Sequence, residues 1–487
     1  MTASDAFRKA LDDHRAGRLD QAAAGYAAIV AADPDHLPAA TNLAVLLYDQ
    51  SRFADAVPLL ETALRLDPAL TEARYILALC LMRTGRPDAA RDAFARAASD
   101  APDDPRPLTG LAALALAAGD FSGALERAEQ ALVRDAANAD ALNLKGAALK
   151  ESGDFAAARD QFERALEVDP DHAEARANRG AIRLLLGEMP AAWTDYAWRW
   201  RGTGRRPPGA ELNLPLWRGE DLAGGRLLLI GEQGFGDTIQ CLRYLTGLTA
   251  RGLRTSVRCR PELKRLVAGL PDVETVWSAD EAAPAGDAYL PMMDLPGLFG
   301  TAADEMPGAE GYLTAEPAAD VGDGTARTVG LVWAGSPTHE NDARRSLPLA
   351  ALGPLLDVPD VRLFSLQVGP GRDDLAACGF SERITDLAPR IGDFADTAAL
   401  VQALDLVITA DTAVAHLAGA LGKPASVMLP FVPDWRWGLE GAETPWYASL
   451  RLYRQPAAGD WAAVVRAIVH DLGSAKRMGD RPDANGP

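Results

Sequence analysis

The sequence has few cysteines, few aromatic residues and fewer positive than negative charges. The low cysteine content and the negative net charge each argue against a class of protein. Only four cysteines occur among 487 residues and none forms a C-x-x-C pair, so a disulfide framework and a cysteine-based zinc site are not expected. The formal net charge of −19 argues against a protein that binds nucleic acid or an anionic membrane. No window approaches the roughly 18 apolar residues of a membrane-spanning helix, so stable membrane insertion is not expected.

The amino-terminal stretch MTASDAFRKALDDHRAGRLD is polar and lacks the apolar segment of a secretory signal peptide. Apolar residues make up 48% of the chain and charged residues 24%, which is the composition of a folded, soluble protein. The expected localisation is therefore the cytoplasm.

A 34-residue period runs through the first 200 residues. Small residues at one offset let two antiparallel helices approach closely, and bulky residues at another fill the space to the next pair. Glycine recurs where the first helix of a pair ends, and Asp-Pro recurs where the second ends. The pattern resembles tetratricopeptide repeats and predicts an all-α solenoid over residues 1–200. The clearest columns are Pro34, Pro68, Pro102 and Pro170; Gly17, Gly85, Gly119, Gly153 and Gly187; and Ala22, Ala56, Ala90, Ala124, Ala158 and Ala192.

A solenoid of this kind presents a concave surface whose usual role is to bind another protein. Asn42 and Asn178 share one repeat offset and are candidates for contacting a bound peptide backbone, although Ile76, Gly110 and Leu144 lie at the same offset between them. An apolar groove for a helical partner segment is an equal alternative, and so is a plain packing role for these positions.

The last repeat changes character in the segment AAWTDYAWRWR, which contains Trp193, Tyr196, Trp198 and Trp200. A capping repeat must end the solenoid. We expect these aromatic residues to dock the solenoid onto the next domain rather than to bind a ligand.

The second half alternates strands and helices, which predicts two successive α/β lobes with parallel sheets. A linker rich in glycine and proline is expected at 201–222, followed by the first lobe at 223–317. A second linker at 318–326 leads to the second lobe at 327–472. The tail at 473–487 is expected to be disordered.

A strand in the first lobe, RLLLI, leads into the glycine turn GEQGFGD. The turn fits neither the dinucleotide fingerprint nor the phosphate-binding loop of ATPases, since its glycines read G-x-x-G-x-G and Asp237 follows Gly236. A carboxylate there would repel a phosphate. Asp237 is therefore a candidate general base at the carboxyl end of a strand, and a capping aspartate is the alternative interpretation.

Two segments of the second lobe carry complementary chemistry. Asp411 and Thr412 open a helix whose free N–H groups suit a phosphate, and His416 lies one turn further on the same face. The loop WAGSPTHENDARRSLPL follows another strand and contains His339 and Arg345. Arg345 is placed to neutralise a leaving phosphate.

The motifs EQGFGDTIQCLRY, WAGSPTHENDARRS and DTAVAHLAGALGKP resemble those of inverting GT-B glycosyltransferases, in particular the heptosyltransferase-like group. The combination with repeats is similar to the plan of the O-GlcNAc transferase class, and most similar to flagellin glycosyltransferases of alphaproteobacteria. The resemblance implies a tetratricopeptide solenoid followed by a GT-B fold of two Rossmann-like lobes.

The resemblance also implies residue roles. Asp237 corresponds to the candidate base, with His339 as the rival base, and Ala413 stands where the family has glycine. Gln367 stands where the family contacts the nucleoside. The donor-binding set comprises Ser336, Arg345, Ser346, Gln367, Asp411, Thr412, Ala413 and His416.

The activity implied is metal-independent, inverting transfer of a sugar to Ser or Thr of flagellin or another protein, with no cofactor beyond the nucleotide-sugar donor. A CMP-linked nonulosonic acid, such as pseudaminic or legionaminic acid, is favoured over a UDP-sugar. The alternatives are a GlcNAc-type transferase acting on another protein, a repeat scaffold with inactive lobes, and a lipopolysaccharide-type transferase.

Overall fold

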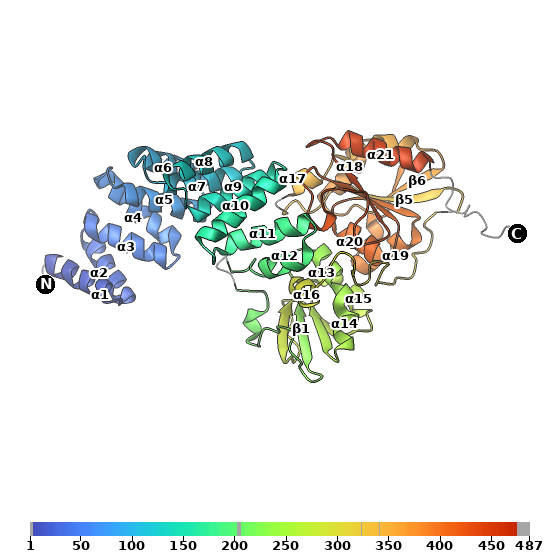
Figure 1. The fold of residues 1–487 in the computed structure, drawn as a ribbon, viewed down its shortest axis with the longest axis horizontal. Coiled ribbons are helices and arrows are strands. Elements are labelled where there is room, and N and C mark those ends of the chain that lie inside the picture. The colour runs from blue at the N-terminus through green and yellow to red at the C-terminus, as the bar shows by residue number, and fades with distance from the viewer. Residues whose placement is uncertain (1–2, 202–205, 323, 340, 475–487) are drawn as a thin grey trace. The chain divides into compact units, whose positions relative to one another are not determined.

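The structure is a computed structural model that describes residues 3–201, 206–322, 324–339 and 341–474. Internal contacts divide the chain into two compact units, Met1–Asn178 and Arg179–Pro487. The first unit is a run of antiparallel helices, and the second places helices around two parallel sheets (Figure 1).

In the first unit each helix packs against the next one along the chain. The alanines at the contact offset, Ala22, Ala56, Ala90, Ala124 and Ala158, are 0% exposed. Gly17 adopts a φ of 72° after the first helix, and Ser51 takes a φ of 59° where this column lacks glycine. The helices are α1 (Ala3–Arg15), α2 (Leu19–Ala32), α3 (Leu37–Asp49), α4 (Phe53–Leu66), α5 (Thr71–Arg83), α6 (Pro87–Asp100), α7 (Arg106–Ala117), α8 (Phe121–Arg134), α9 (Ala139–Glu151) and α10 (Phe155–Val168).

Bulky side chains fill the space opposite small residues. Tyr26, Leu60, Phe94 and Phe162 are each 0% exposed. A Cβ on Gly146 would lie 2.7 Å from a ring carbon of Phe162, so this ring fits only because position 146 has no side chain. The predicted all-α repeat architecture is confirmed.

The last helical hairpin belongs by its contacts to the second unit. The repeat pattern extends to residue 200, whereas the division between the units falls after Asn178, within α11 (Ala173–Leu185). Arg179 of α11 donates to both carboxylate oxygens of Asp195 on α12 (Met189–Tyr196), at 2.7 and 2.8 Å. The hairpin thus keeps the repeat pattern while packing with the α/β part of the chain.

An aromatic cluster joins α12 to the α/β part. The ring centroids of Trp193 and Tyr196 lie 5.6 and 5.8 Å from that of Trp435, and the Trp193 indole N–H donates to the carbonyl of Thr301 over 2.8 Å. Both Trp193 and Tyr196 are buried. The prediction that aromatic residues dock the last repeat onto the following domain is confirmed for these two.

The first lobe has a parallel sheet in the order β3-β2-β1-β4. The helical segment after the glycine turn is divided by a 3-10 turn at Leu242–Tyr244. Part of the predicted linker belongs to this lobe, since Leu216 bridges to Tyr289 and Trp217 is 2% exposed, while residues 202–205 lie outside the described residues. The elements are β1 (Arg226–Ile230), α13 (Phe235–Cys241), α14 (Leu245–Ala250), β2 (Arg254–Arg258), α15 (Lys264–Ala268), β3 (Val273–Trp277), β4 (Ala288–Pro291) and α16 (Leu295–Leu298).

The second lobe has a parallel sheet in the order β10-β9-β8-β5-β6-β7, and its central strands are buried along their length, as in sheets covered on both faces. A 3-10 helix, η5 (Leu349–Asp357), follows α17 and contains Pro354. The elements are β5 (Arg327–Val332), α17 (Asp342–Arg345), β6 (Val361–Ser365), α18 (Asp374–Ala377), β7 (Ile384–Asp386), α19 (Phe394–Ala403), β8 (Leu406–Ala410), α20 (Ala413–Ala420), β9 (Ala425–Leu429), β10 (Leu450–Arg454) and α21 (Trp461–Ser474).

Two of the predicted boundaries fall at the edges of the described residues. The described residues of the linker expected at 318–326 form no helix, and β5 begins directly after them. Residue 323 lies outside the described residues. The disorder expected over 473–487 is wrong for Gly473 and Ser474, which end α21, and the remainder of that tail lies outside the described residues.

Replacing Trp193 with alanine should lower the free energy of unfolding of the second unit by about 3–5 kcal/mol, because a packed indole and its hydrogen bond are both lost. The measurement is scanning calorimetry of the full chain. Trp198→Ala is the matched control, since Trp198 is only half-buried and its loss should cost less. Equal effects of the two changes would contradict a docking role for Trp193.

Candidate functional site

Asp237 lies in the first turn of α13, directly after β1 and the glycine turn. Gly234 begins the helix and donates its N–H to Oδ2 of Asp237 over 2.7 Å. The capping interpretation is thus confirmed in a modified form, with the aspartate at the third helical position. Its side chain remains 16% exposed, so capping does not remove the carboxylate from solvent.

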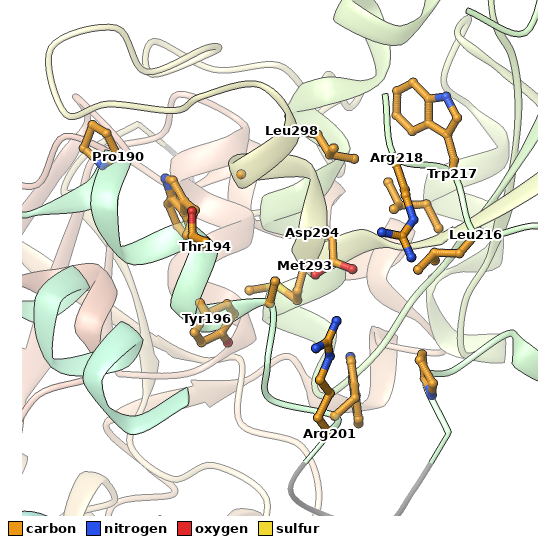
Figure 2. Close-up of a pocket in the computed structure, with 16 residues that line it drawn as sticks. Pro190, Thr194, Tyr196, Arg201, Leu216, Trp217, Arg218, Met293, Asp294 and Leu298 are labelled. Carbon is orange, nitrogen blue, oxygen red and sulfur yellow. The ribbon is translucent and has the colours of Figure 1, made fainter. Parts of the chain in front are cut away.

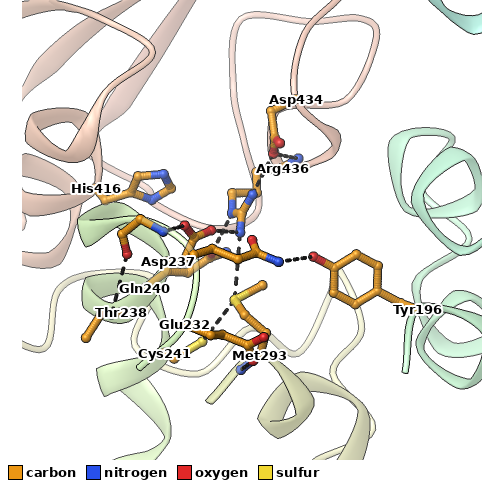
Figure 3. A network of polar contacts seen from close by, with 12 residues as sticks. Tyr196, Glu232, Asp237, Thr238, Gln240, Cys241, Met293, His416, Asp434 and Arg436 are labelled. Carbon is orange, nitrogen blue, oxygen red and sulfur yellow. Dashed lines mark hydrogen bonds and ion pairs between the residues drawn. The ribbon is translucent and has the colours of Figure 1, made fainter. Parts of the chain in front are cut away.

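The other oxygen of Asp237 accepts a hydrogen bond from Arg436 of the second lobe (Figure 3). Arg436 is 6% exposed and also donates to Oδ1 of Asp434 over 2.8 Å. The sequence analysis did not single out this arginine, which lies in the segment PDWRWG. The available signal was an aspartate two residues before an arginine in an otherwise apolar segment.

His416 lies against α13 at a point of close approach. A Cβ on Gly236 would lie 2.5 Å from Cδ2 of His416. The Nδ1 atom of His416 lies 2.9 Å from the hydroxyl oxygen of Tyr447. Burial, reinforced by the charge of Arg436, holds the pKa of His416 well below its usual value of 6.5. This histidine is therefore neutral at pH 7.

The amino terminus of α20 is the predicted anion site, and its binding of an anion stays a prediction. Thr412 caps the helix by accepting a hydrogen bond from the N–H of Val414 over 3.3 Å, and Ala413 is the first helical residue. Asp411, just before the cap, is 9% exposed, and burial followed by the charge of Asp434 raises its pKa to about 7. A protonated carboxyl at this point does not repel an anion, as a carboxylate would.

The loop after β5 orders its side chains around α17. Ser346 accepts a hydrogen bond from the N–H of Gly335 over 2.9 Å and donates to Asp342 over 3.1 Å. Arg345 lies 3.3 Å from Asp342 and beside Gly335, where a Cβ would lie 2.6 Å from its Nη2 atom. Ser336 is exposed and shares a hydrogen bond with Thr338.

His339, the rival base, belongs to the same loop. Its Nδ1 accepts the N–H of Asn341 over 3.1 Å. Burial and the charge of Arg345 lower its pKa below 6.5, while the charges of Asp237 and Asp434 act in the opposite direction. His339 is thus close enough to the Asp237 network to share its electrostatic field.

Gln367 was expected to contact the nucleoside, and in the structure its side-chain amide is hydrogen-bonded to backbone groups. Its Oε1 accepts from the N–H groups of Trp333 and Ala334, both over 3.0 Å. Its Nε2 donates to the carbonyls of Ala334 and Val368, at 3.1 and 2.9 Å. The side chain ties the end of β5 to the end of β6, and its assignment to the nucleoside stays a prediction.

The two asparagines expected to contact a partner lie in the repeats of the first unit. Asn42 donates to the hydroxyl of Tyr26 over 3.2 Å, and Asn178 donates to Asn143 over 2.9 Å. Both are half-buried, so each keeps part of its side chain in solvent. Their role in binding a partner stays a prediction.

A buried ion-pair network at the end of β1 was not foreseen from the sequence. Glu232 pairs with Arg199 over 2.7 Å and accepts the N–H of Met293 over 2.9 Å, and Arg199 also contacts Asp294 over 2.6 Å. Burial raises the pKa of Glu232 to about 7 despite the neighbouring arginine. The network connects the segment after α12 to the first lobe.

A cavity of about 390 Å³ lies between α12 and the first lobe (Figure 2). Trp193, Tyr196 and Met293 form part of its wall, and Arg201 and Arg218 add positive charge. The Sδ atom of Met293 is 3.8 Å from Nη2 of Arg436, so the cavity shares a wall with the Asp237 network.

Among the residues described, no group of three or more His, Cys, Asp or Glu side chains could hold a metal ion. None of the helices described combines the length and apolar character needed to cross a bilayer.

Tetratricopeptide repeat models match residues 7–69, 41–105 and 115–182, and the model for glycosyltransferase family 9 (heptosyltransferase) matches residues 369–427. The chain therefore combines tetratricopeptide repeats with a glycosyltransferase family 9 domain. The matched part of that domain includes α20 and the predicted residues from Asp411 to His416.

Among curated proteins, the chain is 26% identical over 480 residues to Protein FlbA of Caulobacter vibrioides, covering 91% of this chain and 73% of FlbA. It is 30% identical over 119 residues to Protein CTR9 homolog of Arabidopsis thaliana, covering 24% of this chain and 11% of that protein. Among solved structures, MamA is 23% identical and covers 35% of this chain and 94% of its own, with a TM-score of 0.33. YrrB, described as a TPR protein with an unusual peptide-binding site, is 20% identical and covers 36% and 90%, with a TM-score of 0.32.

The raised pKa of Asp411 predicts a pH dependence of stability. The pKa rises from 3.8 to about 7 on folding, so the folded protein binds this proton more tightly. The resulting stability is complete below about pH 4 and is lost as the pH rises through about 7. Between about pH 4 and 7, the thermal midpoint of Asp411→Asn should therefore fall less with rising pH than that of the native chain.

The matched control is Asp373→Asn, which removes the same charge from an exposed position and should leave the pH dependence unchanged. Parallel pH curves for Asp411→Asn and the native chain would contradict the assigned pKa.

Proposed function

We propose that the protein transfers a sugar from a nucleotide-sugar donor to a serine or threonine hydroxyl of a protein, with flagellin as the favoured acceptor. The observation that carries this proposal is the close approach of two helices of different lobes. The helix of the candidate base, α13, meets α20, which lies in the matched glycosyltransferase segment, where Gly236 contacts His416.

The proposed step is a single in-line displacement that inverts the anomeric carbon. The hydroxyl oxygen bonds to that carbon, the bond from the carbon to the phosphate oxygen breaks, and the hydroxyl proton passes to Asp237. Arg345 and the first N–H groups of α20 stabilise the departing phosphate. These groups supply positive charge at the leaving group, so the proposed reaction needs no metal ion.

His339 is the competing candidate for the base. Its lowered pKa leaves the imidazole neutral at pH 7 and therefore able to accept a proton. Asp237 is preferred because the backbone and Arg436 fix both of its oxygens, whereas the His339 ring accepts a neighbouring N–H within its own loop.

The proposed acceptor and donor rest on resemblance. Tetratricopeptide repeats bind protein segments, which supports a protein acceptor delivered by the first unit. The resemblance to flagellin-modifying enzymes, together with the similarity to FlbA along most of the chain, supports flagellin and a role in flagellum assembly. It also favours a CMP-linked nonulosonic acid over a UDP-sugar as donor.

Thermal unfolding of the purified chain with CMP, UDP, GDP or ADP should identify the donor class. A nucleotide at 100 times its dissociation constant stabilises its site by about 2.7 kcal/mol, which raises the melting temperature of a domain of 150–250 residues by roughly 5–11 °C. We expect the largest shift with CMP. The absence of a shift with every nucleotide would favour a repeat scaffold with inactive lobes.

Replacing each of the two candidate bases in turn separates their roles. Asp237→Asn keeps the shape of the side chain and should lower the rate of transfer by about 10²–10⁴-fold, because no group then accepts the hydroxyl proton. His339→Gln should have a much smaller effect. The measurement is donor-dependent modification of acceptor protein, in EDTA, followed by intact mass spectrometry. Retained activity of Asp237→Asn with loss in His339→Gln would reverse the assignment.

A further inference from the structure

Arg436 is a buried cation that forms an ion pair with the Asp237 carboxylate. It lies in η8 (Trp435–Trp437) of the second lobe and reaches across to α13 of the first lobe. Its Nη2 contacts Asp237, its Nη1 contacts Asp434 and its Nε contacts the amide oxygen of Gln240. Each of the three nitrogens of the guanidinium therefore has a side-chain acceptor.

The carboxylate of Asp237 is consequently fixed at both oxygens. Oδ2 accepts the N–H of Gly234 and Oδ1 accepts Nη2 of Arg436. Two donors from different lobes thus hold the carboxylate in one orientation. The side chain of Asp237 is still 16% exposed.

We propose that Arg436 is a positioning residue for sugar transfer: it holds the Asp237 carboxylate in the orientation that receives the acceptor hydroxyl. The inference rests on the proposed function and deepens it. In the transfer step the hydroxyl proton moves to Asp237, and that proton is later released to solvent.

Arginine suits this position for a geometric reason. A planar guanidinium can direct separate N–H groups at three acceptors, whereas a lysine ammonium is a point charge on a flexible stem. Burial alone would lower the pKa of Arg436, but the charges of Asp434 and Asp237 raise it, so the cation persists. Other titratable groups that face this cluster from neighbouring elements are Tyr196, Cys241, Asp411 and His416.

A purely architectural Arg436 would affect stability and leave kcat unchanged. A positioning role lowers kcat and leaves the KM for the donor nearly unchanged. The charge and the geometry of the arginine can be separated, because lysine keeps the charge and loses the fork, while methionine loses both.

The test measures kcat and KM for the donor with full-length Arg436→Lys and Arg436→Met. For Arg436→Met we expect kcat to fall roughly 10- to 100-fold, the worth of a charged hydrogen bond. For Arg436→Lys kcat should fall less, because the charge is kept while the fork is lost. The KM for the donor should change less than about threefold in both, since the loss is in the reacting step.

The matched control is Arg454→Met. Arg454 donates to the carbonyls of Gly438 and Gly441, at 2.9 and 3.0 Å, and also to Trp437, so it supports the same loop without touching Asp237. Its loss should lower the thermal midpoint and leave kcat nearly unchanged. An unchanged kcat in Arg436→Met, or an equal fall of kcat in Arg454→Met, would overturn the inference.

A second measurement does not require activity. If the native chain transfers no sugar, the proposed function fails, and thermal midpoints of Asp237→Asn, Arg436→Met and the double variant still test the contact. We expect the double variant to lose clearly less than the sum of the single losses, because each single change leaves a partner unpaired. Additive losses would overturn the role of Arg436 on their own.

Discussion

The arrangement of the candidate site depends on how closely α13 and α20 approach each other. Position 236 has room for no side chain, since a Cβ there would lie 2.5 Å from the imidazole of His416. That imidazole is itself fixed by Tyr447, whose ring in turn packs against Gly419 with no space for a Cβ. Two glycines therefore set the separation of the two lobes at the point where the candidate base lies beside the second lobe.

This close packing places charged side chains in the interior, where each must be compensated. Arg436 is compensated by two carboxylates, and Arg199 by Glu232 and Asp294. Arg243 is held differently: it donates to the carbonyls of Gln240 and Trp446, both over 3.0 Å, and lies 4.7 Å from the ring centre of Tyr447. Removing one partner from such a group leaves an unpaired charge buried in a medium of low dielectric constant, which is energetically costly. These arginines therefore specify one relative placement of the segments they join.

The sequence was most informative where a pattern repeats or where a single turn has strict backbone requirements. The 34-residue columns predicted the helices of the first unit, because every repeat buries the same alanine. The glycine turn placed Asp237 correctly, and the cap at Thr412 placed α20. Arg436 could not be found in this way, since 199 residues separate it from Asp237 and no local periodicity records a contact at that range. Gln367 shows the opposite difficulty. A polar residue beside a strand end can look available for a ligand, whereas its side-chain amide is hydrogen-bonded to backbone groups.

The second lobe also explains how a carboxyl group can stand at the mouth of the proposed anion site. Asp411 precedes α20, where a carboxylate would oppose a phosphate and offset the positive end of the helix. Burial and the nearby charge of Asp434 raise its pKa to about 7, which keeps a large share of the group protonated at neutral pH. The positive charge of Arg345 acts in the other direction and lowers the pKa of Asp411, so that the group stays close to half-protonated at neutral pH. An anion at α20 would favour the protonated form further, so anion binding and proton uptake at Asp411 are linked by the same electrostatic field.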